Sequence, residues 1–546
     1  MGINKKSLVR YIELTKPELS NNSADAERLK DALKKELKTE HISIPLFLAA
    51  SLPEKLRKWE HRVKCVIFKE LNFWSVAAIR DPEENETLCG VAADIGTTRV
   101  VLQLLDLETG EVINERGFDN PQAAIAPDVL ARIHYAGKNS GAGLKELHSP
   151  ALFPGAGMGI HGNSGSAGLK ELQSLIINGI NANILALCKE SSIDPAMVYL
   201  FSGAGNTAMT HLFLGLDPLY IIREPYIPAV NAPEPVNAGE LGLLINPGAK
   251  VFLFPNVGSY FGGDLMAGIF YSGLHKKENP CLMVDVGTNA EVVVGNRDWL
   301  MACAGAAGPA LEGGVSDMGM TAGPGVIDRV KIDPETRKID IHTIDEKPAI
   351  GICGSGMIDL AAELFLSGML DIRGKFSKKR CESRLFEKRG VDCFRLVDKA
   401  ETGTGDDIFL SQVDMNSLTS SKAAMHSILE VIVNQTAGLD FDELERFYVA
   451  GTFGSFINPQ SAISIGMLPD MPLEKFEVLG NSSLKGAAKL LLDSSAFKEI
   501  EGIRDGITYI ELNVNQEFMN IFSGAKFYPH TDRSRFPSVK LYYDET

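Results

Sequence analysis

Apolar and polar positions along the first 88 residues predict a small α/β segment. Between residues 24 and 37, charged and apolar residues recur at helical spacing, and Asp25 lies near the expected helix start. The pattern that follows predicts one short helix and then two strands, in residues 52–59, 63–68 and 73–79. A charged connection that contains proline, residues 81–87, ends this segment.

From residue 89 onward the pattern changes to apolar runs joined by tight glycine turns. Two of these turns are alike, and each lies between two strand-like runs: Asp94–Thr98 (DIGTT) and Asp285–Asn289 (DVGTN). We call them the first and second acidic loops, because an aspartate opens each turn. Two such loops, each opening its own strand-rich segment, predict a duplicated nucleotide-binding fold.

The residue types in the acidic loops suit a phosphate and a metal ion. Glycine lets backbone N–H groups approach a ligand closely, and successive N–H groups in a turn form a concave anion site. Threonine hydroxyls add donors, and an aspartate can hold Mg²⁺ directly or through water. The alternative is that both aspartates are buried acids that cap their own hairpins. In the phosphate interpretation the binding residues are Gly96, Thr97, Thr98, Gly287, Thr288 and Asn289, with Asp94 and Asp285 as metal ligands.

Several residues outside the acidic loops are further site candidates. Glu312 lies in a segment of small residues and is a candidate for orienting an attacking water, or else a carboxylate at a helix N-terminus. Asp264 follows a pair of glycines and is a second candidate catalytic acid. Gly354 and Ser355 begin a predicted helix, where they form either an anion site or a helix cap.

A third glycine turn, residues 203–208, matches the dinucleotide fingerprint G-x-G-x-x-A. No acidic residue closes a second strand about 20 residues further on, as that fingerprint requires. We therefore favour a close-packed strand-to-helix turn that lines a cleft. His211, on the apolar helix that follows, is expected to be a structural histidine.

Composition narrows the classes of partner. The chain has 546 residues and a formal net charge of −16, which argues against a nucleic-acid or anionic-membrane surface as its main partner. No apolar run approaches the ~18 residues of a membrane span, and the N-terminus has no hydrophobic stretch typical of a secretory signal. We expect a cytoplasmic protein with no nucleic-acid or membrane partner.

The cysteines show no spacing that indicates a metal centre. None of the eight forms a Cys-x-x-Cys pair, and no cluster has ferredoxin-type spacing. Most are expected to be small buried hydrophobic residues. We therefore expect no iron–sulfur cluster in this chain.

A wider set of strings resembles one known family. DIGTT, DVGTNAE, GPALEGG, CGSGMIDL and AGTFGSFINP are similar to the ATP-dependent reductive activators of corrinoid proteins, within the superfamily of actin, Hsp70 chaperones, and sugar and acetate kinases. The resemblance implies an α/β fold: a two-lobed actin-like ATPase, built as a duplicated ribonuclease-H-like fold and preceded by a small α/β domain. It also implies ATP and Mg²⁺ as cofactors, with one glycine-rich turn beside the adenosine: Gly451, Thr452, Phe453 and Gly454.

The resemblance also implies a division of the chain. Residues 1–24 would be a linker segment, and residues 25–88 a small α/β middle domain. Residues 89–546 would form the actin-like ATPase domain, with one lobe at about 89–275 and the other at about 276–546.

The implied function is an ATP-dependent return of an inactive Co(II) corrinoid protein of a methyltransferase system to Co(I). The implied partners are the corrinoid protein and a second copy of the chain. Typical members carry a [2Fe–2S] ferredoxin domain before the linker, and others carry cluster-binding cysteines at the C-terminus; this sequence shows neither. Either it is part of a longer chain, or it takes electrons from a separate ferredoxin-like donor.

Three other functions stay open at this stage. A small-molecule kinase of the sugar or acetate type would need an acceptor pocket with a catalytic base, which the sequence does not single out. A non-catalytic ATP-gated binding protein would need neither. An activator of the 2-hydroxyacyl-CoA dehydratase type would hold a [4Fe–4S] cluster across a dimer, and Cys303 and Cys353 are its candidate ligands.

Overall fold

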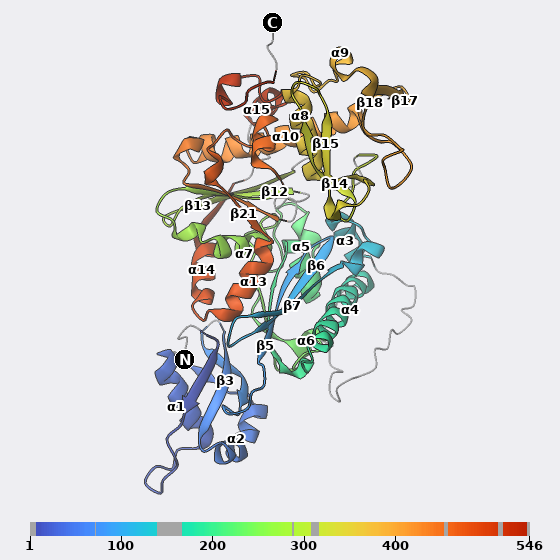
Figure 1. Ribbon diagram of the computed structural model, residues 1–546. Helices are drawn as coiled ribbons and strands as arrows, with labels where there is room; N and C mark the ends of the chain where they lie inside the picture. The colour runs from blue at the N-terminus through green and yellow to red at the C-terminus, as the bar shows by residue number, and fades with distance from the viewer. Residues whose placement is uncertain are drawn as a thin grey trace. The chain divides into compact units, whose positions relative to one another are not determined.

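The computed structural model describes residues 7–70, 72–138, 166–286, 289–306, 316–451, 457–510 and 517–542 (Figure 1). The described chain forms two compact units. The first holds the residues up to Tyr271 together with Ser482–Asp505, and the second holds Ser272–Asn481 and the residues from Gly506 onward. No sequence pattern had indicated that Ser482–Asp505 belongs to the first unit.

The first unit begins with a four-stranded sheet of strand order β1-β3-β4-β2 (Figure 1). Leucines recurring at helical spacing are buried on both helices of this segment, which explains why the residues form helices here. β1 pairs antiparallel with β3, so residues on both sides of the expected boundary at residue 24 share one sheet. The elements are β1 (Val9–Glu13), α1 (Asp25–Leu37), β2 (Ile42–Ser43), α2 (Leu46–Lys58), β3 (Arg62–Lys69) and β4 (Trp74–Arg80).

A six-stranded sheet forms the centre of the first unit, in the order β7-β6-β5-β8-β10-β9. β5, β6 and β7 form antiparallel hairpins. β8 pairs in parallel with β5, and β10 pairs in parallel with β8. Its strands are β5 (Cys89–Ile95), β6 (Arg99–Asp106), β7 (Val112–Asp119), β8 (Val198–Ala204), β9 (Val236–Asn237) and β10 (Lys250–Leu253). The helices of this unit are α3 (Val129–Ala136), α4 (Ala167–Glu190), α5 (Thr207–Leu214), α6 (Ala238–Leu241), α7 (Gly263–Ser272), α13 (Ser482–Leu492) and α14 (Ala496–Gly506).

The second unit repeats this arrangement. Its six-stranded sheet has the order β21-β20-β11-β12-β13-β22. β11, β12 and β13 form antiparallel hairpins, β20 pairs in parallel with β11, and β21 pairs in parallel with β20, as β8 pairs with β5 and β10 with β8. Only the sixth strands differ, because β9 pairs with β10 whereas β22 pairs with β13. The two sheets therefore confirm the predicted duplication. The strands are β11 (Cys281–Val286), β12 (Asn289–Gly295), β13 (Leu300–Ala306), β20 (Arg446–Ala450), β21 (Phe476–Gly480) and β22 (Ile507–Ile510).

Two small sheets and several helices complete the second unit. The sheets have the orders β15-β14-β16 and β17-β18-β19. Their strands are β14 (Val326–Ile332), β15 (Ile339–Thr343), β16 (Gly351–Ile352), β17 (Leu385–Lys388), β18 (Val391–Val397) and β19 (Ile408–Ser411). The helices are α8 (Gly354–Leu366), α9 (Lys378–Cys381), α10 (Gln412–Glu430), α12 (Pro459–Ser464) and α15 (Phe518–Ala525).

The long helix of the second unit begins earlier than the sequence pattern suggested. The apolar pattern of residues 421–438 is typical of a helix, but α10 begins at Gln412 and is followed by a π-helical turn over Val431–Thr436. Ser411 and Asp414 form a capping box, in which each side chain accepts from the other's backbone N–H, so the helix starts ahead of its apolar run. None of the described helices combines the length and the apolar character needed to cross a membrane.

Aromatic side chains join the four-stranded sheet to the centre of the first unit. Phe497 on α14 packs edge-to-face on Phe68 of β3 and on Phe252 of β10, with ring centroids 5.0 and 5.5 Å apart. An ion pair between Lys250 and Glu70 (2.8 Å) lies in the same junction. The segment Ser482–Asp505 thus contacts both sheets of the first unit.

Candidate functional site

The first acidic loop connects β5 to β6, and its carbonyl groups are held from one side. Asn120 Nδ2 donates to Gly96 O (2.9 Å), and the Asn120 N–H donates to Thr98 O (2.8 Å). Arg132 Nη2 donates to Thr97 O (2.7 Å). Because the N–H of a trans peptide points opposite to its C=O, these bonds turn the intervening N–H groups away from Asn120 and Arg132. The loop therefore presents N–H groups in the way that an anion site requires.

Arg132, on α3, was not predicted as a site residue, and it fixes the first acidic loop from behind. Its side chain is fully buried. Its guanidinium donates to Ala126 O (3.0 Å) and Gln122 Oε1 (3.1 Å) as well as to Thr97 O. Burial lowers the pKa of Arg132 to about 10, and the nearby charge of Asp128 opposes that shift. Arg132 is therefore a positioning residue for the loop.

Two carboxylates and a serine meet at the carboxyl end of β5. Ser483, at the start of α13, donates from Oγ to Asp94 Oδ1 (2.9 Å). Asp264 lies in the first turn of α7. Burial raises the pKa of Asp264 to about 6, the N–H of Leu265 opposes the rise, and the charge of Asp94 adds to it. The structure thus brings Asp94 and Asp264 close enough to interact, although 169 residues separate them in the sequence.

The β8–α5 turn closes a further side of the same site. Asn206 Nδ2 donates to Thr97 Oγ1 (3.0 Å), while Asn206 Oδ1 caps α5 by accepting from the Met209 N–H. A Cβ on Gly205 would lie 2.7 Å from Ile95 O, so only glycine allows this turn to pack against β5. The glycines at residues 203 and 205 are thus explained by close packing.

The second acidic loop follows β11, and the structure brings its aspartate beside the turn after β20. Asp285 and Ala450 are paired across the parallel strands β11 and β20. Gly451 has φ +85°, and a Cβ there would lie 2.5 Å from Asp285 Oδ1. Asp285 and Gly451 therefore lie side by side.

Some predicted site residues lie outside the described part of the chain. These are Gly287, Thr288, Glu312, Thr452, Phe453 and Gly454. Asn289 begins β12, and Thr98 is exposed at the tip of the first acidic loop. The roles predicted for all of these residues stay predictions.

The start of α8 is occupied by structural contacts. Ser355 is buried, and its hydroxyl donates to Asp328 O of β14 (3.4 Å). A Cβ on Gly356 would lie 2.4 Å from Ile327 O, so the glycine allows α8 to approach β14. The contacts of the described residues here favour a packing role for Gly354 and Ser355, and an anion site stays a prediction.

The two cysteines proposed as cluster ligands are enclosed within the second unit. Cys303 lies on β13 opposite Val292 of β12, is fully buried, and has its pKa raised far above the usual range by that burial. Cys353 is also buried and donates from Sγ to Ile327 O (3.3 Å). A cluster shared by two subunits needs ligands at the surface, and neither thiol lies there.

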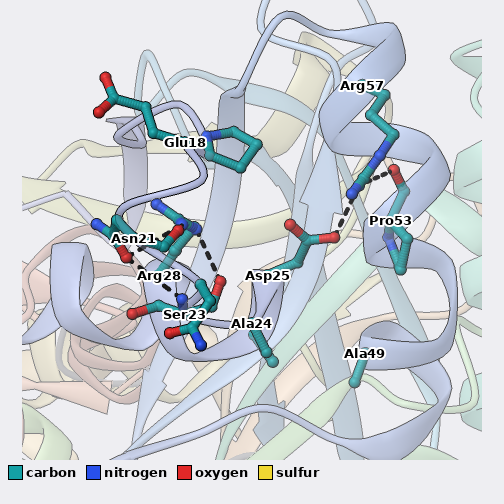
Figure 2. Close-up of a pocket in the computed structure, with 12 residues that line it drawn as sticks. Glu18, Asn21, Ser23, Ala24, Asp25, Arg28, Ala49, Pro53 and Arg57 are labelled. Carbon is teal, nitrogen blue, oxygen red and sulfur yellow. Dashed lines mark hydrogen bonds and ion pairs between the residues drawn. The ribbon is translucent and has the colours of Figure 1, made fainter.

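A hollow of about 510 Å³ lies in the N-terminal sheet segment, beside the loop that precedes α1 (Figure 2). Arg28 lines the hollow, and its guanidinium donates to Ser23 O (2.9 Å) and Asn21 O (2.5 Å). Arg57 and Asp25 form an ion pair (2.8 Å) across it. Arg57 and Asp25 pair with each other, and Arg28 is bonded to the backbone. The contacts of these charged groups therefore hold the loop in place and do not indicate a ligand site.

The carboxylates of the first unit fit a hard cation that also binds phosphate. Mg²⁺ prefers oxygen ligands and is usually held by one or two carboxylates together with phosphate oxygens and water. Asp94 and Asp264 supply such carboxylates next to a loop that presents N–H groups. Across the described ranges, no cluster of three or more His, Cys, Asp or Glu side chains is arranged to hold a metal by itself.

Family profiles match the chain in three successive stretches. The first is the RACo linker region, over residues 3–86. The second is the RACo middle region, over residues 89–152 and 160–277. The third is described as the C-terminal domain of RACo, the ASKHA domain, over residues 279–540.

Individual proteins show the same similarity. The chain is 32% identical over 451 residues to the corrinoid activation enzyme RamQ of Eubacterium limosum, covering 81% of this chain and 70% of that protein. It is 24% identical over 295 residues to the [Co(II) methylated amine-specific corrinoid protein] reductase of Methanosarcina barkeri, covering half of each. Among solved structures, a reductive activator for corrinoid, iron–sulfur protein superposes with a TM-score of 0.83 and 36% identity, over 98% of this chain and 81% of that one.

Proposed function

The chain belongs to the family of reductive activators of corrinoid proteins, and on that premise we propose that it returns an inactive Co(II) corrinoid protein to Co(I) in an ATP-dependent cycle. The observation that carries the proposal is the pair of acidic loops at equivalent places in two sheets that share the order of five strands. Each loop follows the central strand of its sheet, where a phosphate would meet backbone N–H groups and a carboxylate.

Within the first unit, we assign roles in nucleotide binding to the residues around the first acidic loop. Thr97 and its neighbours would donate backbone N–H groups to a phosphate, while Arg132 and Asn206 hold the loop in place. Asp94, held by Ser483, and Asp264 would supply carboxylate oxygens to Mg²⁺. Transfer of the terminal phosphoryl group of ATP to water would release the free energy for the cycle, Mg²⁺ would stabilise the charge of the phosphates, and Glu312 and Asp264 are the candidate catalytic residues.

The activator's task follows from the energetics of the reaction. Reducing Co(II) to Co(I) is uphill for cellular electron donors, so the activator must bind the Co(II) protein differently in its different nucleotide states. Such coupling works when ATP and its hydrolysis products stabilise different conformations of the activator. We propose a separate ferredoxin-like protein as the electron donor, a homodimer as the working form, and the cytoplasm as its location.

The test is reduction of a Co(II) corrinoid protein in the presence of the activator, a low-potential reductant, ferredoxin and ATP. The growth of Co(I) absorbance is followed with and without ATP. We expect reduction to depend on ATP and to be lost in Asp94→Asn, whereas Ser482→Ala, which removes a buried hydroxyl that bonds to no described residue, serves as the matched control. Equal rates with and without ATP would refute the assignment.

A further inference from the structure

One exposed surface of the second unit carries positive charge on an otherwise acidic chain. Residues 372–381 contain five Lys or Arg and no Asp or Glu, whereas the whole chain has a net charge of −16. Two exposed apolar side chains accompany the exposed cations, Ile372 (45% exposed) and Val413 (54%). We call this set the basic surface, and it consists of Ile372, Arg373, Lys375, Lys378, Lys379 and Val413.

The backbone that carries the basic surface is a fixed turn. Asp371 Oδ1 accepts from the N–H groups of Arg373 and Lys375, both at 2.8 Å. Gln412, in the first turn of α10, donates from Nε2 to Gly374 O (2.7 Å) and accepts from the Phe376 N–H (3.2 Å). These bonds hold the turn against α10, beside Val413.

A buried cluster anchors the same turn from below. The N–H of Tyr528, a fully buried residue, donates to Ile372 O (3.0 Å). A Cβ on Gly374, where φ is +74°, would lie 3.0 Å from the Tyr528 ring. Lys422, also fully buried, donates from Nζ to the carbonyls of Ala525 and Pro529 on either side of Tyr528. The cations of the basic surface are therefore presented by a rigid part of the unit.

Nearby carboxylates do not neutralise this charge. Asp371 uses one carboxylate oxygen for the backbone of the turn, and Glu382 forms an ion pair with Arg337 (2.7 Å). Lys375 Nζ donates to the neutral Asn416 (3.2 Å). No ion pair within the described ranges involves Arg373, Lys378 or Lys379. Four like charges held close together, with Asp371 as the carboxylate of their turn, leave an excess of positive charge that an acidic partner would offset.

We propose that the basic surface docks the acidic iron–sulfur protein that supplies the electron, an inference that rests on the proposed function. An iron–sulfur cluster held by four cysteine thiolates is anionic. A surface that binds the donor next to its cluster is therefore expected to carry positive charge. The net negative charge of the remaining chain repels such a partner, which steers it toward the basic surface. Electron-transfer encounters use small interfaces of this kind, governed by charge.

The location of the surface separates this partner from the strands that flank the second acidic loop. Within the second unit, α9 and β17 lie apart from β12, β13 and β21 (Figure 1). A donor on the basic surface would therefore leave the second acidic loop free. One electron leaves the reduced cluster, which becomes oxidised, and enters the Co(II) of the corrinoid protein, which becomes Co(I); no proton and no bond is involved.

The test compares two variants with the same change in net charge. The first reverses the basic surface, with Arg373→Glu, Lys378→Glu and Lys379→Glu. The control reverses three other exposed cations, with Lys35→Glu, Lys347→Glu and Lys399→Glu. Binding of a plant-type [2Fe–2S] ferredoxin to each purified protein is measured by calorimetry at low ionic strength and again at about 1 M salt, where the Debye length falls to about 3 Å.

We expect the first variant to bind ferredoxin about tenfold more weakly than the wild type at low salt, and the control to bind within about twofold. High salt should remove the difference between them. Equal binding by the two variants would overturn the proposal, and so would loss of corrinoid-protein binding with ferredoxin binding intact. Because ferredoxin binding is measured without ATP or cobalt, it can succeed when the ATP-dependent reduction fails, so the two proposals are tested separately.

Discussion

Ser483→Ala removes one hydroxyl that holds the carboxylate of Asp94. Its Oγ donates to Asp94 Oδ1 at 2.9 Å, and Ser483 stands at the start of α13. A hydrogen bond to a charged group contributes ~1.5–3 kcal/mol, and its loss removes that contribution to the orientation of the Asp94 carboxylate at the first acidic loop. Each ~1.4 kcal/mol corresponds to a factor of ten, so we expect Mg²⁺·ATP affinity to fall between about tenfold and a hundredfold.

The neighbouring serine gives a matched control. Ser482 is also buried at the start of α13, but its Oγ has no hydrogen-bond partner among the described residues. Ser482→Ala therefore removes the same atom from the same helix turn without breaking a bond. It should leave nucleotide affinity unchanged and be neutral or slightly stabilising, because an unsatisfied hydroxyl is removed.

Mg²⁺·ATP affinity is measured by isothermal titration for the wild type, Ser483→Ala, Asp94→Asn and the double variant Asp94→Asn/Ser483→Ala, which together form a double-mutant cycle. Ser482→Ala is titrated beside them as the control. The Ser483 effect should shrink in the Asp94→Asn background, because the acceptor no longer carries a charge. Equal losses from Ser482→Ala and Ser483→Ala would refute the reasoning, as would an undiminished Ser483 effect in the Asp94→Asn background.

Three further predictions follow from described contacts. Arg132→Lys keeps the charge but not the planar fork that reaches Thr97 O, so nucleotide affinity should fall about tenfold in the same titration; unchanged affinity would contradict the positioning role. Gly451→Ala and Gly438→Ala both place a Cβ at positive φ, at a cost of ~1–2 kcal/mol in urea unfolding, but only Gly451→Ala should also weaken nucleotide binding, because its Cβ would meet Asp285. Burial and nearby cations lower the pKa of His426 well below 6.5, so it stays neutral when folded and takes up a proton when unfolded. Stability should then fall as the pH drops below about 6.5, and His426→Phe should reduce that slope between pH 7.5 and 5.5; parallel slopes for both proteins would contradict this.

The local sequence pattern was sufficient to predict the sheet hairpins and the acidic loops. Each loop is set by an apolar strand, an aspartate, a glycine and a second apolar strand, all within a short stretch of chain, and those signals need no information from elsewhere. The duplicated strand order follows from the same local signals repeated. The start of α10 could also have been found, because Ser411 and Asp414 have capping-box spacing, although the polar residues after Ser411 concealed it.

The supporting residues of the site depend on contacts that no local pattern reveals. Ser483 and Asp94 are 389 positions apart in the chain, and only the folded first unit brings them together. Arg132 could not be recognised, because a charged residue on a helix predicts solvent exposure, whereas its guanidinium is buried and bonded to backbone carbonyls. His211 was expected to be structural, and its ring nitrogens contact Thr207 O (2.7 Å) and the Ala229 N–H (3.1 Å).

The return of Ser482–Asp505 to the first unit has a consequence for biosynthesis. During translation the earlier residues of that unit leave the ribosome long before this segment, and the whole of Ser272–Asn481 is made in between. Until then the nascent first unit lacks the hydrogen bond from Ser483 to Asp94, and the surface that Phe497 covers stays exposed. Domains generally fold as their residues emerge, but this unit cannot close until synthesis is nearly finished, which exposes it to chaperones and proteases meanwhile. A nascent chain stalled before residue 482 would carry both acidic loops and still lack a complete first unit.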